Sequence, residues 1–109
     1  MKDYDGKSAF YLAFKNEHVE IMEMLIENFS KVDIDPNAKS NGLTIFLWAC
    51  KNGHTKITEL LIQNSFDLNV QLNEKESSGR TGFHMAIESG YMEIVDILMI
   101  NSEEVFSIT

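Results

Sequence analysis

The stretch from Gly42 to Ile62, GLTIFLWACKNGHTKITELLI, decides the fold, because the same pattern occurs once before it and once after it. The related stretches are GKSAFYLAFKNEHVEIMEMLI from Gly6 and GRTGFHMAIESGYMEIVDILM from Gly79, so the units begin 36 and then 37 residues apart. Each unit has a Gly-x-Ser/Thr opening, an aromatic residue, an alanine three residues later and a second apolar run. Such self-similarity indicates a solenoid of stacked units rather than a globule with one closed core.

Each unit is predicted to contain two short amphipathic helices joined by a tight turn. In the middle unit, two sets of residues follow the i, i+3, i+4 spacing of a helix face: Phe46, Ala49 and Cys50, and then Ile57, Leu60 and Leu61. Gly53 separates the two sets, which favours an antiparallel helical hairpin. The inward residues of the first unit are predicted to be Phe10, Ala13 and Phe14, followed by Ile21, Met24 and Leu25. Hydroxyl groups that can cap the first helices stand at Ser8, Thr44 and Thr81.

These units resemble ankyrin repeats, which have about 33 residues and a T-P-L-H-x-A pattern near the first helix. The middle unit matches the family pattern at Thr44, Ala49, Gly53, His54, Ile57, Leu61 and Asn69. The family proline is absent from all three units, and the family histidine is kept only as His84, where it is a local hydrogen-bonding residue. The resemblance implies an all-α, helix-turn-helix repeat solenoid with extended or hairpin loops. We expect this solenoid to form a single domain over residues 1–109, with repeats at approximately 3–38, 39–75 and 76–109.

Composition limits the classes of function. The apolar fraction of 44% is normal for a folded chain, and no run approaches the roughly 18 apolar residues of a membrane span. Seventeen acids against nine bases give a net charge of −8, which opposes binding to nucleic acids and favours a basic partner. The single cysteine fits a reducing compartment, and MKDYDGKSAF lacks the apolar core of a signal peptide. We therefore expect a cytoplasmic or nuclear protein.

The sequence offers little support for catalysis. His18 and His54 occupy equivalent places in two units and Tyr91 occupies that place in the third, so repeat symmetry favours a structural role over metal binding. Cys50 falls on a predicted inward face and should be inert. No phosphate-binding loop or catalytic triad is present, so we expect no enzyme activity, no cofactor and no metal. An enzyme that uses the three histidines is the alternative, and it would require bound metal.

The resemblance implies protein–protein recognition along the concave side, at the turn tips and the exposed ends of the first helices. It points to Tyr4, Lys7, Lys15, Asn16, Ser40, Asn41, Leu43, Lys51, Asn52, Asn73, Glu74, Arg80, Glu88 and Ser89. Trp48 is either the anchor of this surface or a core residue between first helices. A basic segment of the partner is expected to meet Glu74, Glu76 and Glu88. The alternative function is a structural spacer, a fragment of a longer array without a dedicated partner.

Two further features concern the ends and the loops. Apolar residues in the first unit and after the third predict either further repeats or self-association through an end: Phe14, Met22, Met24, Ile100, Val105 and Phe106. The segment 28–40 is predicted to be a loop with extended pieces, and the longer loop 67–78 is a candidate for specificity. In the family, asparagines in the position of Asn69 are targets of asparaginyl hydroxylation. The alternative is that Asn69 braces its loop by hydrogen bonds to nearby backbone.

Overall fold

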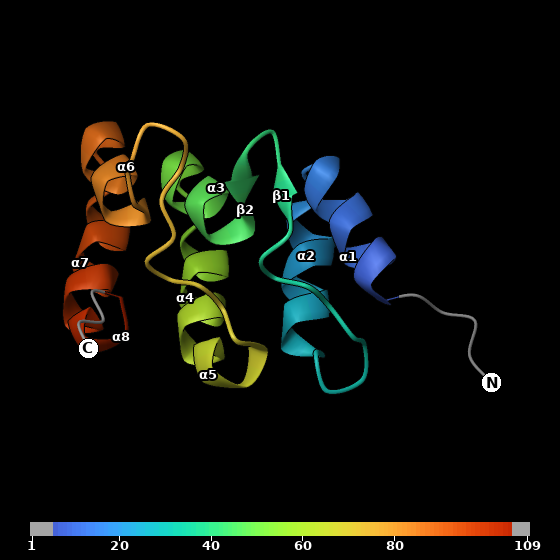
Figure 1. Cartoon of the computed structure of the whole chain (residues 1–109). Helices are drawn as coiled ribbons and strands as arrows, with labels where there is room; N and C mark the ends of the chain where they lie inside the picture. The colour runs from blue at the N-terminus through green and yellow to red at the C-terminus, as the bar shows by residue number, and fades with distance from the viewer. Residues whose placement is uncertain (1–5, 106–109) are drawn as a thin grey trace.

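The computed structural model describes residues 6–105, except for the side chains of Lys7 and Glu104. Three helical hairpins stand in a row to form an elongated body with extents of 44 × 27 × 23 Å (Figure 1). The elements in order are α1 (Gly6–Lys15), α2 (Val19–Glu27), β1 (Lys39–Ser40), β2 (Leu43–Thr44), α3 (Ile45–Asn52), α4 (Thr55–Gln63), α5 (Ser65–Leu68), α6 (Gly82–Ser89), α7 (Met92–Ile100) and α8 (Ser102–Val105). The predicted all-α repeat solenoid is confirmed.

Hydroxyl caps start the first helices of the second and third hairpins, as the sequence predicts. The Thr44 Oγ1 atom accepts a hydrogen bond from the backbone N–H of Leu47 at 3.3 Å. Thr81 forms a capping box with His84, whose Nδ1 atom lies 2.9 Å from Thr81 Oγ1 and accepts from Thr81 N at 3.2 Å. The expected cap at Ser8 is wrong, because α1 begins at Gly6 and places Ser8 inside the helix.

The second and third hairpins pack on each other through both of their helices, whereas the first hairpin packs on the second mainly through α2. Helix α3 lies against α6, while α2 contacts α4 and α4 contacts α7. The middle hairpin is therefore covered on two sides, and every side chain of α3 from Ile45 to Cys50 is buried. The apolar core runs along the stack as one continuous cluster, as expected when stacked units bury a shared face.

The inward residues predicted for α2 are partly wrong. Met24 is 60% exposed and Ile21 is 48% exposed, whereas Met22 and Ile26 are fully buried. The reason is the position of the helix at an end of the stack. Within the described residues α2 has a repeat beside it only on the α4 side, so the face that turns toward α4 is buried and the opposite face is left open.

The predicted excess of apolar side chains at the ends also needs correction. Phe14, Met22 and Val105 are buried within the chain, so they are not available at an end. Met24 and Ile100 are exposed as expected, at 60% and 73%. Phe106 lies outside the described residues.

The two loops between hairpins lie side by side along one face of the stack (Figure 1). The first has the predicted extended pieces, since β1 and β2 pair antiparallel with Lys39 opposite Thr44, and Asn41 and Gly42 make the turn in the left-handed region. The second loop contains no strand in the described part of the chain. A hydrogen-bonded side chain, that of Asn37, joins the two loops.

Candidate protein-interaction surface

A hollow of about 230 Å³ lies where the end of α1, helix α3 and the β1–β2 turn meet. Six of the residues predicted to bind a partner line this hollow: Ser40, Asn41, Leu43, Trp48, Lys51 and Asn52. Phe14 and Glu17 of the first hairpin complete its wall. The fold therefore brings residues from two separate segments of the chain, 14–17 and 40–52, to one place.

Trp48 lies at the base of this hollow and not on its rim. Its side chain is only 8% exposed, because its ring stacks on the His54 ring at a centroid distance of 4.5 Å and meets the Phe14 ring edge-on at 5.6 Å. Of the two alternatives for Trp48, an anchor of the surface or a core residue, its burial agrees with the core residue. The structural role that repeat symmetry suggested for His54 thus includes a ring contact that the repeat pattern could not predict, because the chain has a single tryptophan.

The C-terminal ends of α1 and α3 present the same arrangement. Lys15 and Lys51 are both exposed, and each is followed by an asparagine. The side-chain amide of Asn16 donates to the carbonyl oxygen of Leu12, and that of Asn52 donates to the carbonyl oxygen of Trp48, both at 2.9 Å. These amides satisfy carbonyl groups at the ends of their own helices. The lysine side chains at these two helix ends are therefore left to extend into solvent.

Predicted residues from the second long loop and α6 are joined by ion pairs. Arg80 contacts both Glu76, at 3.5 Å, and Glu88. Lys39 of β1 lies 3.3 Å from Glu74. Ser89 donates from its hydroxyl group to the carbonyl oxygen of Lys51 at 3.3 Å, which ties the end of α6 to the end of α3.

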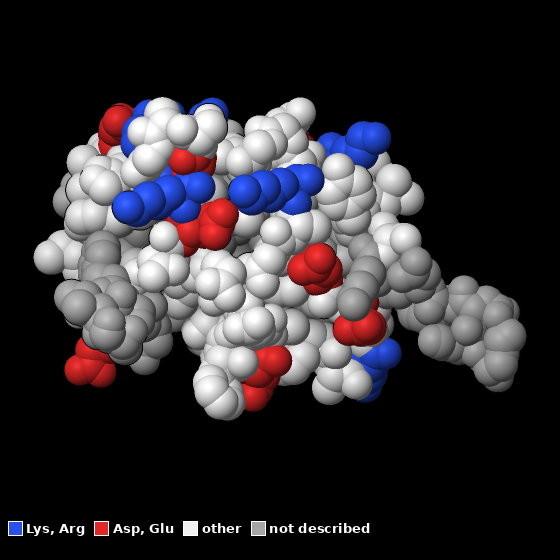
Figure 2. Space-filling model, in the orientation of Figure 1, with Lys and Arg blue, Asp and Glu red and all other residues white. Residues whose placement is uncertain are grey.

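Charges of both signs are interspersed on this face of the molecule. Most of the basic side chains visible in Figure 2 lie in its upper half, toward the β1–β2 turn, and acidic side chains lie between and below them. Of the remaining predicted residues, Asn73 is exposed, the side chain of Lys7 is not described and Tyr4 lies outside the described residues.

Glu76 organises the turn that leads into α6. One of its carboxylate oxygens, Oε1, accepts hydrogen bonds from the Ser78 hydroxyl group, from Ser78 N at 2.6 Å and from Arg80 N at 3.2 Å. These donors, the Ser78 hydroxyl first and the Arg80 backbone next, lower the pKa of Glu76 to about 2. The sequence suggested Glu76 only as an acid for a basic partner, and its role in the turn comes from the hydrogen bonds that the structure shows.

Cys50 and the acidic and histidine side chains were also considered as candidates for chemistry. Burial raises the pKa of the Cys50 thiol to about 12, so the thiol is protonated at neutral pH. Within residues 6–105, no three side chains of His, Cys, Asp or Glu are grouped closely enough to hold a metal ion. None of the helices that the structure describes has the length and hydropathy needed to cross a bilayer.

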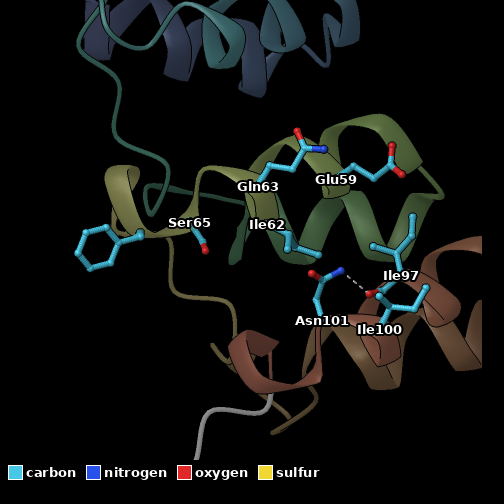
Figure 3. A pocket seen from close by; sticks show the side chains of 8 residues that line it. Glu59, Ile62, Gln63, Ser65, Ile97, Ile100 and Asn101 are labelled. Carbon is cyan, nitrogen blue, oxygen red and sulfur yellow. Dashed lines mark hydrogen bonds between the residues drawn. The ribbon is translucent and has the colours of Figure 1, made fainter.

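A second hollow, of about 530 Å³, lies on the side of the second helices and was not predicted (Figure 3). Ile62 of α4 and Ile97 and Ile100 of α7 line it, together with Asn101, whose side-chain amide donates to the carbonyl oxygen of Ile97 at 2.8 Å. Phe66 of α5 also borders the hollow and is 94% exposed. Phe66 and Ile100 have no counterpart in the repeat pattern, so sequence periodicity gave no signal for them.

Comparison with known protein families agrees with the architecture. The family model described as ankyrin repeats (3 copies) matches residues 28–108, and the single ankyrin repeat model matches residues 5–41. A comparison with curated proteins gave no match. Ankyrin repeats are in general protein–protein interaction modules without enzymatic activity of their own. Because the matched segment includes most of the sequence, the chain belongs to the ankyrin repeat family.

Proposed function

We propose that this chain recognises a partner protein through the hollow between the first two hairpins and the adjoining ends of α1, α3 and α6. The observation that supports this proposal most is that six residues to which the family resemblance points line one hollow together with Phe14 and Glu17 of the preceding hairpin. The exposed lining of the hollow is mainly polar, with Ser40, Asn41 and Asn52 around the half-buried Leu43, and Phe14 is buried behind it. Such a lining suits a partner that forms hydrogen bonds as well as apolar contacts.

The expected partner is basic, because the chain carries a net charge of −8. The field of the whole protein would steer such a partner, so raising the salt concentration should slow association. Direct ion pairs are a weaker basis for recognition here, since Glu74, Glu76 and Glu88 already contact Lys39 or Arg80. A partner that uses these acids must displace the internal pairs.

The proposal is tested by charge reversal on two sides of the same helical hairpins. Proteins retained by the wild-type chain from an extract of its source cells are compared with those retained by the Lys51→Glu and Glu20→Lys variants. Lys51 borders the proposed site, whereas Glu20 is an exposed residue of α2. Because Lys51→Glu makes the chain more negative and Glu20→Lys makes it less so, the comparison is made at high salt, where the steering of a basic partner is screened. There we expect Lys51→Glu to lose a partner that Glu20→Lys keeps, and the reverse result would contradict the assignment of the site.

The second candidate function is that of a structural spacer within a longer array. The internal pairing of the acids around Arg80 and Lys39 favours it, because paired charges on a surface have less to offer a partner. The double variant Lys51→Glu, Asn52→Glu separates the two functions. If it retains every protein that the wild-type chain retains, the spacer function is supported and the recognition site is not.

A further inference from the structure

The two ends of the stack expose apolar side chains from opposite faces of the hairpin. At the first hairpin Leu12 is 60% exposed and Ile21 is 48% exposed, and these two residues define the leading face. At the third hairpin Ile87 is 51% exposed and Met99 is 59% exposed, and these define the trailing face. Contiguous apolar side chains on a folded surface usually mark a site of contact.

The residues of the leading face are equivalent to those through which the second and third hairpins contact the hairpin before them. Leu12 is equivalent to Trp48, which contacts Phe14 of the preceding hairpin, and to Met85, which is 3% exposed. Ile21 is equivalent to Ile57 and Ile94, and both of these side chains are fully buried. The leading face is thus one half of the junction that the chain forms twice within itself.

The trailing face is the other half of the same junction. Ile87 is equivalent to Phe14, which contacts Trp48 of the next hairpin, and to Cys50, which packs closely against Gly82 of the next hairpin. Met99 is equivalent to Ile26 and Ile62, which are 0% and 7% exposed. Because both end faces are equivalent to halves of the internal junctions, each end should fit the opposite face of another such hairpin.

The trailing face also has space for a second hairpin. It contains an open hollow of about 590 Å³, which is lined mainly by the apolar side chains of Ile87, Met92, Val95 and Met99. A Cβ added at Gly53 would lie 2.9 Å from the Tyr91 ring of the next hairpin, whereas one added at Gly90 would meet nothing within 4 Å. The residue equivalent to Tyr91 in the first hairpin is His18, and its side chain is exposed.

We infer that a second copy of this chain stacks head to tail, with its leading face on the trailing face of the first. His18 of the second copy would then cover Gly90, as Tyr91 covers Gly53. Lys15 would lie beside Glu88, because Lys15, Lys51 and Glu88 occupy equivalent places in the three hairpins. The contact joins two different faces, so it leaves one of each free and generates open chains rather than closed dimers.

Sedimentation of the chain at increasing concentration tests this inference. We expect the average mass to rise without reaching a fixed dimer. High salt should favour the association, since two copies of charge −8 repel each other and the contact itself is apolar. This dependence is opposite to the one expected for the basic partner proposed above, so the two proposals fail separately.

Two single variants and their mixture give the decisive comparison. Leu12→Asp places a charge in the leading face and Ile87→Asp places one in the trailing face, and each alone should weaken self-association by about tenfold or more. Mixed in equal amounts, the two variants should form a discrete dimer, because each retains the face that the other lacks. Phe66→Asp is the matched control, since Phe66 is a more exposed apolar residue that belongs to neither face, and it should associate as the wild type does.

Circular dichroism of each variant, compared with that of the wild type, shows that a loss of association does not come from unfolding. A wild-type chain that remains monomeric at all concentrations and salt conditions would overturn the inference. So would a dimer that persists in Leu12→Asp alone, because it would show a symmetric contact of two trailing faces. Loss of association in Phe66→Asp would assign the contact to the hollow between the second helices instead.

Discussion

The side-chain amide of Asn37 donates a hydrogen bond to the carbonyl oxygen of Asn69 at 2.8 Å, across 32 residues of sequence. The Oδ1 atom of the same side chain accepts from the backbone N–H of Gln71 at 3.0 Å. One asparagine therefore holds the two inter-repeat loops together. Asn69 takes part through its backbone, in the left-handed region with φ 56°, so the bracing role that the sequence suggested for its side chain belongs to Asn37.

Replacing Asn37 by Ala should lower the free energy of unfolding by about 1 kcal/mol, because two partly solvated hydrogen bonds between the loops are lost. Urea denaturation measures the change. Asn73→Ala is the matched control: Asn73 is an exposed asparagine of the second loop whose side chain makes no hydrogen bond within the described residues. If both substitutions lower the free energy of unfolding by the same amount, the hydrogen bonds of Asn37 between the loops do not contribute to stability.

Replacing Leu61 by Ala should cost about 2–5 kcal/mol, because Leu61 is fully buried in α4 at the centre of the stack and its removal leaves a cavity. If this variant does not fold, Ile57→Val at the neighbouring buried position should still show a loss of about 0.5–1.5 kcal/mol. Ala in place of the exposed Glu20 should change stability by less than about 0.5 kcal/mol. A large loss at Glu20 would contradict the burial pattern of α2.

Gly82 stands where a family proline is expected, and the structure explains why a small residue is needed there. A Cβ at this position would lie 2.9 Å from Cys50 Sγ and 3.0 Å from Phe46 Cε2. Gly82→Ala should therefore destabilise the chain by about 1–3 kcal/mol through overpacking, less what alanine gains in helix propensity. In a Cys50→Ala background the loss should shrink, because the sulfur atom is gone. A double-mutant cycle in urea gives the coupling, and an equal loss in both backgrounds would rule out the contact.

The carboxylate of Glu76 should make stability depend on pH in the acid range. Its folded pKa is lowered to about 2 from an ordinary 4.5, so its contribution is complete above the ordinary pKa and is lost as pH falls toward 2. The difference in unfolding midpoint between the wild type and Glu76→Gln should therefore be present at neutral pH and fade over this interval. Ser78→Ala removes the largest cause of the lowered pKa and should move the NMR titration of Glu76 to higher pH. No movement would show that the hydroxyl group does not hold the carboxylate.

Asn69 is the proposed site of hydroxylation in this chain. Its side chain is exposed, at the end of the short helix α5. After treatment with an asparaginyl hydroxylase, peptide mapping should show the gain of one oxygen atom on Asn69 and none on Asn73. Because the bond from Asn37 restrains this loop, the Asn37→Ala variant should react faster. Unchanged mass at Asn69 in both proteins would exclude the modification.

The repeat pattern was sufficient to predict the three helical hairpins and their order. Periodicity carries this information because equivalent positions such as Phe10 and Phe46 have equivalent neighbours, and both are buried. It failed at the ends, where Ile21 has the sequence environment of Ile57 but lacks a preceding hairpin in the described structure. The repeat pattern predicts which face of a hairpin is apolar. Whether that face is buried depends on whether another hairpin lies beside it.

Interactions that occur once in the chain were beyond the reach of the pattern. The stacking of Trp48 on His54 depends on a tryptophan found in only one unit, and the contacts of Asn37 and Glu76 arise in loops of unequal length. Phe66 and the hollow between the second helices likewise have no repeated counterpart. Sequence periodicity thus predicts the shared frame of the three hairpins and leaves out the features that distinguish them.

The burial of Ile45 to Cys50 in α3, which packs against α6 and meets α1 through Trp48 and Phe14, has a consequence for the order in which the chain opens. Backbone amides of α3 are shielded by a hairpin on each side, whereas those of α1 and α7 border faces with exposed apolar side chains. In a linear stack the outer hairpins can unfold while the centre stays folded. The free energy of opening measured by hydrogen exchange should therefore be lower for the outer hairpins than for the centre. Since each hairpin packs mainly on the one beside it, folding can spread outward from α3 and α4 through contacts that are close in sequence, a topology that favours rapid folding.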